Sequence, residues 1–179
     1  MRIQEIIDRK INPEWVPKPQ SPRLIEVTES LPDPPSKRAD LVFEKTVFNY
    51  ILENKQSLGV SNVYQLRAAR TDGLLKLDTG QMVLLEIKYA LGWVKCCQAR
   101  IQFEWFLRRM AYYKLCVNKP ENALIIFHHF SRDWARIGKK NNRQKGWNNF
   151  YDEQDNLSYY GSLNIHIAQL TDEKCLVVY

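Results

Sequence analysis

Two charged residues, Glu86 and Lys88, lie at the end of an almost unbroken apolar run that begins at Met82. Such a run is typical of a central β-strand that is buried on both faces. Side chains two residues apart on a strand point to the same face, so the carboxylate and the ammonium group are expected side by side. Burying a charge without a partner costs about 3 kcal/mol or more. The pair therefore indicates an ion pair, a metal site or a reaction.

A second carboxylate, Asp72, precedes this strand in a predicted β-hairpin over residues 71–89. Residues 78–80 suit a three-residue loop in which Gly80 adopts the left-handed conformation. Counting back along the ladder from that loop sets Asp72 opposite Glu86, with Cβ atoms about 5 Å apart. A two-residue loop would shift the register by one and turn Asp72 to the other face. Two carboxylates this close repel each other unless a cation lies between them.

A third acid, Glu44, lies within a segment whose apolar side chains recur with the period of a helix, over about residues 36–56. It falls in the middle of the apolar stripe, between Leu41 and Phe48, and the stripe continues through Val47, Ile51 and Leu52. An acid on the buried face of a helix either pairs with a core arginine or belongs to an active site. Both interpretations stay open at this point.

The remaining elements are predicted as strands over 60–70, 121–130 and 163–170, a long helix over 93–117 and a short helix over 133–139. Residues 138–158 are polar and aromatic and predict a long loop. The long helix has a predicted buried stripe and, beside it, a polar one that contains Gln98, Gln102, Trp105 and Arg109. The buried stripe consists of Ala99, Phe103, Phe106, Met110 and Tyr113. The order helix, three strands, helix, strand predicts an α/β fold, with a mixed β-sheet flanked by helices on both faces.

Seven of the eight prolines precede residue 36, which predicts an extended proline-rich arm over 1–36 and a single domain over 37–179. No apolar run approaches the roughly 20 residues that a membrane helix needs. The N-terminus lacks the layout of a secretory signal, and the four cysteines show no CxxC pair and make no zinc spacing with the three histidines. We therefore expect a soluble cytoplasmic protein with reduced thiols and no membrane contact.

Basic residues concentrate in one region. Residues 95–145 carry twelve Lys or Arg against three acids, a local charge of +9 within a net charge of +6. A one-sided basic region favours a polyanionic ligand such as nucleic acid. The alternative is a basic face that serves only solubility.

The arrangement of Asp72 followed by Glu86-Ile87-Lys88 on the next strand resembles the PD-(D/E)XK nuclease superfamily, which has the restriction-endonuclease-like fold. The resemblance covers about residues 38–130 and implies an α-β-β-β-α-β core. It also implies a glutamate from the first helix, matched by Glu44, and a glutamine from the second, matched by Gln98 or Gln102. Thr71 stands where the motif has a proline.

The resemblance implies a Mg²⁺ site, in which Mn²⁺ can substitute, held by Asp72, Glu86 and the main-chain carbonyl of Ile87. Lys88 would orient or deprotonate the attacking water, or stabilise the charge that develops on the phosphate. Glu44 would hold metal-bound water or a second ion, and Gln98 and Gln102 would position the lysine or the phosphate. Candidates for contacts with the nucleic-acid backbone are Arg67, Arg70, Arg100, Arg109, Lys139, Lys140, Arg143 and Lys145.

The function expected from these residues is a metal-dependent nuclease that acts on DNA, as an endonuclease rather than an exonuclease. A homodimer would suit cleavage of both strands, with the aromatic segment 147–160 as its interface. His128 and His129 are expected to end a core strand. Two alternatives stay open: an inactive nucleic-acid-binding module on the same fold, and an α/β protein in which the buried charges form a structural network.

Overall fold

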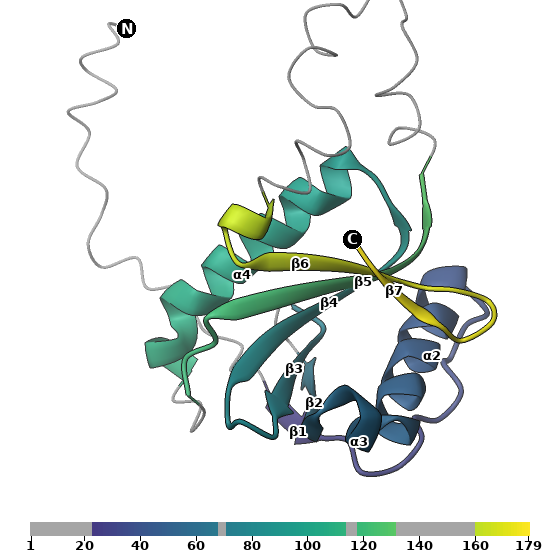
Figure 1. The fold of residues 1–179 in the computed structure, drawn as a ribbon, viewed down its shortest axis with the longest axis horizontal. Helices are drawn as coiled ribbons and strands as arrows, with labels where there is room; N and C mark the ends of the chain where they lie inside the picture. Colours follow the sequence, from purple (N-terminus) through teal and green to yellow (C-terminus); the bar gives the residue numbers. More distant parts are fainter. Residues whose placement is uncertain (1–22, 68–70, 114–117, 132–159) are drawn as a thin grey trace, which may run out of the picture.

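The computed structural model describes residues 23–67, 71–113, 118–131 and 160–179, without the side chains of residues 93–94 and 108–113 (Figure 1). The predicted short helix at 133–139 and the predicted loop at 138–158 lie outside these residues, as does all but the last residue of the segment 147–160. Within the described residues, seven strands form one sheet in the order β1 to β7. The elements are β1 (Arg23–Glu26), α2 (Ala39–Glu53), α3 (Lys55–Leu58), β2 (Val60–Arg67), β3 (Gly73–Leu77), β4 (Met82–Leu91), α4 (Trp93–Tyr113), β5 (Asn122–Phe130), β6 (Ile165–Leu170) and β7 (Leu176–Val178).

The sheet is mixed, as predicted. Each successive pair from β1 to β4 is antiparallel, the pairs β4–β5 and β5–β6 are parallel, and β7 is antiparallel to β6. The parallel step from β4 to β5 is made by α4, because a parallel connection needs a crossover. None of the described helices is long and apolar enough to cross a membrane.

Helices cover both faces of the sheet, which confirms the predicted α/β arrangement (Figure 1). Successive side chains of a strand point to opposite faces. Leu74 and Leu84 accordingly join the core cluster that contains the buried face of α4, whereas Leu75 and Leu85 join the cluster that contains α2. This alternation is why β4 reads as a continuous apolar run in the sequence.

The hairpin between β3 and β4 has the predicted register. The N–H of Leu77 donates to the carbonyl of Gln81 at 2.9 Å, and Gly80 has a φ of 83°. The ladder then runs back to the pair Gly73 and Leu85. Extending it by one residue sets Asp72 level with Glu86.

The buried stripe of α2 differs in part from the prediction. Val47, Phe48 and Ile51 are buried as expected, but Leu41 and Leu52 are only half-buried, and Phe43 is buried instead. The helix is also shorter than predicted, because Asn54 separates it from the short α3. On α4, the predicted Ala99, Phe103 and Phe106 are buried, together with Cys96; the side chains of Met110 and Tyr113 lie outside the described part.

Two short edge strands were not predicted. Strand β1 pairs with β2 inside the segment expected as an extended arm, and Val27 directly after it is buried in the core. Strand β7 pairs with β6 through three residues. Neither strand has an apolar pattern long enough to be recognised in the sequence, because an edge strand needs little burial.

Candidate active site

The candidate site lies where β4 extends beyond its partner β3. Strand β3 begins at Gly73, which pairs with Leu85, whereas β4 continues to Leu91. Over residues 86–91 of β4, the neighbouring strand among the described residues is β5, on the other side. The sheet therefore opens at this point, and main-chain groups of β4 face the opening.

The side chain of Asp72 occupies this opening. Its Oδ2 accepts a hydrogen bond from the main-chain N–H of Ile87 at 2.7 Å. In a strand, the N–H and C=O of one residue point to the same side. The carbonyl of Ile87 is therefore turned toward Asp72 as well, and both residues line one cavity of about 360 Å³.

Glu86 is fully buried, and one of its carboxylate oxygens contacts the ammonium group of Lys88. The two side chains share a face of β4, as the two-residue spacing predicts. The other oxygen, Oε2, is buried and has no hydrogen-bond partner within the described part of the chain. Leaving a buried acceptor unsatisfied costs about 1–3 kcal/mol, and more for a charged group. This oxygen is therefore suited to a cation.

Both carboxyl groups hold their protons more tightly than usual. Burial raises the pKa of Asp72 to about 6, and the nearby charge of Glu44 adds to this effect, against the hydrogen bond from Ile87 and the charge of Lys88. Burial also raises the pKa of Glu86 to about 8, and the charge of Asp72 adds to it. Lys88 and a hydrogen bond from the main-chain N–H of Asp72 oppose this second shift but do not cancel it. A bound divalent cation would favour the ionised form of both carboxyl groups.

Glu44 reaches the same cavity from α2. Its Oε1 accepts a hydrogen bond from Nε2 of Gln65 at 3.2 Å, so its partner is a glutamine on β2 and not the core arginine that the sequence left open. Arg67 lies beside this pair, because its Nε donates to Oε1 of Gln65 at 3.4 Å. The cavity lining thus brings Glu44 together with Asp72, Ile87 and Lys88, whereas Glu86 and Arg67 lie beside the cavity and do not line it.

Four further residues line the cavity and were not predicted as site residues: Asp40, Tyr89, Ala90 and Lys95. Asp40 precedes Glu44 by four residues, which puts both acids on one face of α2 and could have been noticed in the sequence. Lys95 lies in the first turn of α4, close behind β4. Gln65 had no signal of its own, because its contact with Glu44 depends on the packing of α2 against β2.

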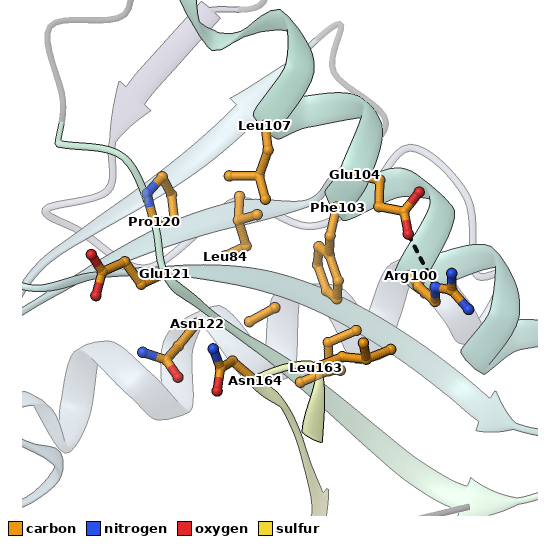
Figure 2. Close-up of a pocket in the computed structure, with 12 residues that line it drawn as sticks. Leu84, Arg100, Phe103, Glu104, Leu107, Pro120, Glu121, Asn122, Leu163 and Asn164 are labelled. Atoms are coloured by element: carbon orange, nitrogen blue, oxygen red, sulfur yellow. Dashed lines mark hydrogen bonds and ion pairs between the residues drawn. The ribbon is translucent and has the colours of Figure 1, made fainter. Parts of the chain in front are cut away.

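Several predicted residues are not brought to this cavity. Gln98 is exposed and Gln102 is half-buried on α4, and neither lines the cavity. Arg100 forms an ion pair with Glu104 at 3.0 Å and lines a different cavity of about 200 Å³ between α4 and the start of β5 (Figure 2). The cavity beside α4 is lined mainly by apolar side chains such as Phe103, Leu107 and Leu163. Arg70, Lys139, Lys140, Arg143, Lys145 and the side chain of Arg109 lie outside the described residues.

The donor set fits Mg²⁺ better than a metal held only by side chains. Within the described ranges, no group of three or more His, Cys, Asp or Glu side chains is placed to hold a metal ion. Mg²⁺ usually keeps several waters and takes one or two carboxylates. Asp72, Glu86 and the carbonyl of Ile87 would supply a set of this kind, and the unpartnered Oε2 of Glu86 is the observation that supports it.

In comparisons with known proteins, no family model, no curated protein and no solved structure matches the chain.

Proposed function

We propose that this protein is a Mg²⁺-dependent nuclease of the PD-(D/E)XK type that hydrolyses phosphodiester bonds in DNA. The observation that carries the proposal is the fully buried Glu86, whose Oε2 lacks a hydrogen-bond partner in the described part of the chain while its other oxygen contacts Lys88. A carboxylate buried in this way has a high cost unless a cation or a reaction requires it.

The element order supports a restriction-endonuclease-like fold. A helix, three antiparallel strands, a crossover helix and a parallel strand follow one another from α2 to β5. The acid before β3 and the acid and lysine on β4 meet at the point where the sheet opens. This is the arrangement that the resemblance in the sequence implies.

Each residue has a defined task in the proposed reaction. Asp72, Glu86 and the carbonyl of Ile87 would hold Mg²⁺, which when bound neutralises phosphate charge and lowers the pKa of water. Lys88 stabilises negative charge that develops on the phosphate and orients the attacking water. Glu44, fixed by Gln65, accepts a hydrogen bond from water at the edge of the cavity. Arg67 and Lys95 lie beside the cavity and supply positive charge for the phosphate backbone.

The net charge of +6 supports a polyanionic substrate. Endonucleolytic action, a homodimer and a cytoplasmic location remain predictions from the sequence that accompany this proposal.

The proposal is tested by cleavage of supercoiled plasmid and of a branched oligonucleotide with Mg²⁺, Mn²⁺ or EDTA. We expect metal-dependent nicking that falls at least about 100-fold in Lys88→Ala, because a charge-stabilising donor is removed. Lys76→Ala is the matched control, since Lys76 is an exposed lysine on β3 outside the cavity lining.

The other outcomes separate the alternatives. A folded wild-type protein that binds DNA but does not cleave it would be an inactive binding module. A folded protein that neither cleaves DNA nor binds Mg²⁺ would contradict the nuclease proposal and leave a structural charge network.

A further inference from the structure

Four aromatic rings gather at the carboxyl ends of β4 and β5: Phe43, Tyr89, His128 and His129. The ring of Tyr89 stacks on that of His128 with centroids 5.1 Å apart and an interplanar angle of 26°. The ring of His129 meets Tyr89 edge-on at 4.9 Å. Phe43 contacts both Tyr89, at 6.0 Å, and His128, at 5.4 Å. We call this group the aromatic cluster.

The aromatic cluster adjoins the candidate active site through Tyr89. Tyr89 directly follows Lys88 on β4, and the parallel register of β4 and β5 sets it level with His128. It lines the active-site cavity and also a second cavity of about 350 Å³, which Phe43 and His128 line as well. A ligand that spans both cavities must therefore pass this ring.

The cluster is anchored at its base and open at its surface. Phe43, on the inner face of α2, is buried with 7% of its surface exposed, whereas Tyr89 is 37% exposed and His129 is exposed. Packing against Phe43 and His128 restricts the tilt of the Tyr89 ring. A ring held in this way loses little entropy when a ligand stacks on it.

The charges around the second cavity suit a nucleotide chain. Lys37 and Lys174 line this cavity, and Lys95 lines the adjoining active-site cavity. Asp172 is the acid in its lining, and one of its oxygens lies 3.6 Å from Nε2 of His128. The aromatic surface can accept the face of a base while the lysines accept phosphates on either side.

We propose that the aromatic cluster, with Tyr89 at its surface, is a stacking site for one unpaired base next to the phosphate that is cleaved. This inference rests on the proposed nuclease function and narrows its substrate class to single-stranded, flapped or branched DNA. Bases within a duplex already stack on one another, so an unpaired base reaches an aromatic ring at less cost than a paired one. Stacking on an aromatic ring tolerates any base, so the site selects DNA structure and not sequence.

The test is binding of a single-stranded oligonucleotide series in which one abasic site is moved along the strand, with Ca²⁺ in place of Mg²⁺. For the wild type, we expect an abasic site at one position to weaken binding about 5- to 100-fold. In Tyr89→Ala, the intact strand should bind more weakly by a similar factor, and the abasic site at that position should have no further effect. Binding of a fully paired duplex should change little.

Three variants separate stacking from packing. Tyr89→Leu keeps apolar contact with Phe43 but lacks a ring, so it should behave as Tyr89→Ala, whereas Tyr89→Trp should keep the abasic-site dependence. Tyr179→Ala is the matched control, because Tyr179 has a similar exposed fraction of 42% and lines neither cavity. Its dependence on the abasic position should equal that of the wild type.

Identical abasic-site profiles for the wild type and folded Tyr89→Ala would overturn the stacking site, as would the absence of any DNA binding. The proposed function fails separately. If the wild type shows no Mg²⁺-dependent cleavage but its abasic-site profile depends on Tyr89, the nuclease proposal is contradicted and the stacking site is kept. If the wild type cleaves DNA but its abasic-site profile equals that of Tyr89→Ala, the stacking site is contradicted and the nuclease proposal is kept.

Discussion

The carboxylate of Asp72 replaces a strand partner for Ile87: its Oδ2 accepts the main-chain N–H of Ile87 at 2.7 Å, fifteen residues further along the chain. In a longer hairpin, a carbonyl of β3 would accept this hydrogen bond. This side-chain hydrogen bond takes the place of a main-chain one, so it ends the ladder between β3 and β4 and still satisfies the buried N–H of Ile87. It also holds the Asp72 side chain beside the carbonyl of Ile87 and level with Glu86.

This hydrogen bond separates the structural role of Asp72 from its proposed role as a metal ligand. Asp72→Asn keeps an oxygen acceptor for the N–H of Ile87, so we expect stability within about 1 kcal/mol of the wild type but loss of Mg²⁺ binding. Asp72→Ala leaves the donor unsatisfied and should cost about 1–3 kcal/mol in addition. Urea denaturation and Mg²⁺ titration of both variants check this. Equal stabilities for the two variants would contradict the structural role.

Glu86 should destabilise the metal-free protein at high pH. Its folded-state pKa of about 8 lies above its ordinary value of 4.5, so folding takes up a proton between these values and stability falls as the pH rises through that window. Glu86→Gln removes this group from titration. We expect the variant to match the wild type near pH 5 and to be more stable by about 1–3 kcal/mol at pH 8.

Denaturation in EDTA at a series of pH values measures this difference. Glu104→Gln is the control, because Glu104 is exposed and paired with Arg100, and its effect should stay within about 0.5 kcal/mol at every pH. A difference between Glu86→Gln and the wild type that does not grow with pH would show that Glu86 is not protonated in the folded protein.

Mg²⁺ affinity should rise with pH. The cation needs ionised carboxylates, and the pKa values of Asp72 and Glu86 are about 6 and about 8 in the metal-free protein. Binding therefore displaces protons below pH 8, and the affinity should increase up to about tenfold per pH unit for each proton displaced. Calorimetry in two buffers of different ionisation enthalpy measures the proton release. An affinity that is constant from pH 6 to pH 8 would contradict the raised pKa values.

Gly73 has no room for a side chain. A Cβ atom there would lie 2.7 Å from the main-chain carbonyl oxygen of Tyr64 and 3.1 Å from the ring of Phe48. Because a carbonyl within a sheet cannot move freely, we expect Gly73→Ala to destabilise the protein by about 1–3 kcal/mol. It should also weaken Mg²⁺ binding, since Asp72 is its neighbour. Thermal unfolding of Gly73→Ala beside Gly161→Ala, where nothing lies within 4 Å of the new Cβ, provides the comparison.

The local part of the site could be predicted from the sequence. The apolar run of β4 with Glu86 and Lys88 two residues apart fixes their common face, because side chains alternate along a strand. The loop at residues 78–80 determines the hairpin register, because Gly80 can adopt a positive φ without strain. Together these two local rules set Asp72 level with Glu86.

The contributions of the helices depended on tertiary structure. The sequence suggested Gln98 and Gln102 from α4, but the residue of α4 that lines the cavity is Lys95, because it lies in the turn closest to the end of β4. Gln65 contacts Glu44 only because β2 brings it beneath α2. Likewise, the edge strand β1 forms through pairing with β2 and not through a pattern of its own.

By itself, the sequence determined the mixed α/β sheet, the hairpin register and the meeting of two carboxylates with a lysine, since these follow from periodicity and turn chemistry over short distances. Only the tertiary structure decided which helix residues reach the opening of the sheet, that Oε2 of Glu86 is buried without a hydrogen-bond partner in the described part of the chain, and that Tyr89 stacks on His128. These features arise from contacts between elements far apart in the chain, whose relative positions are fixed by the packing of the whole sheet and its helices.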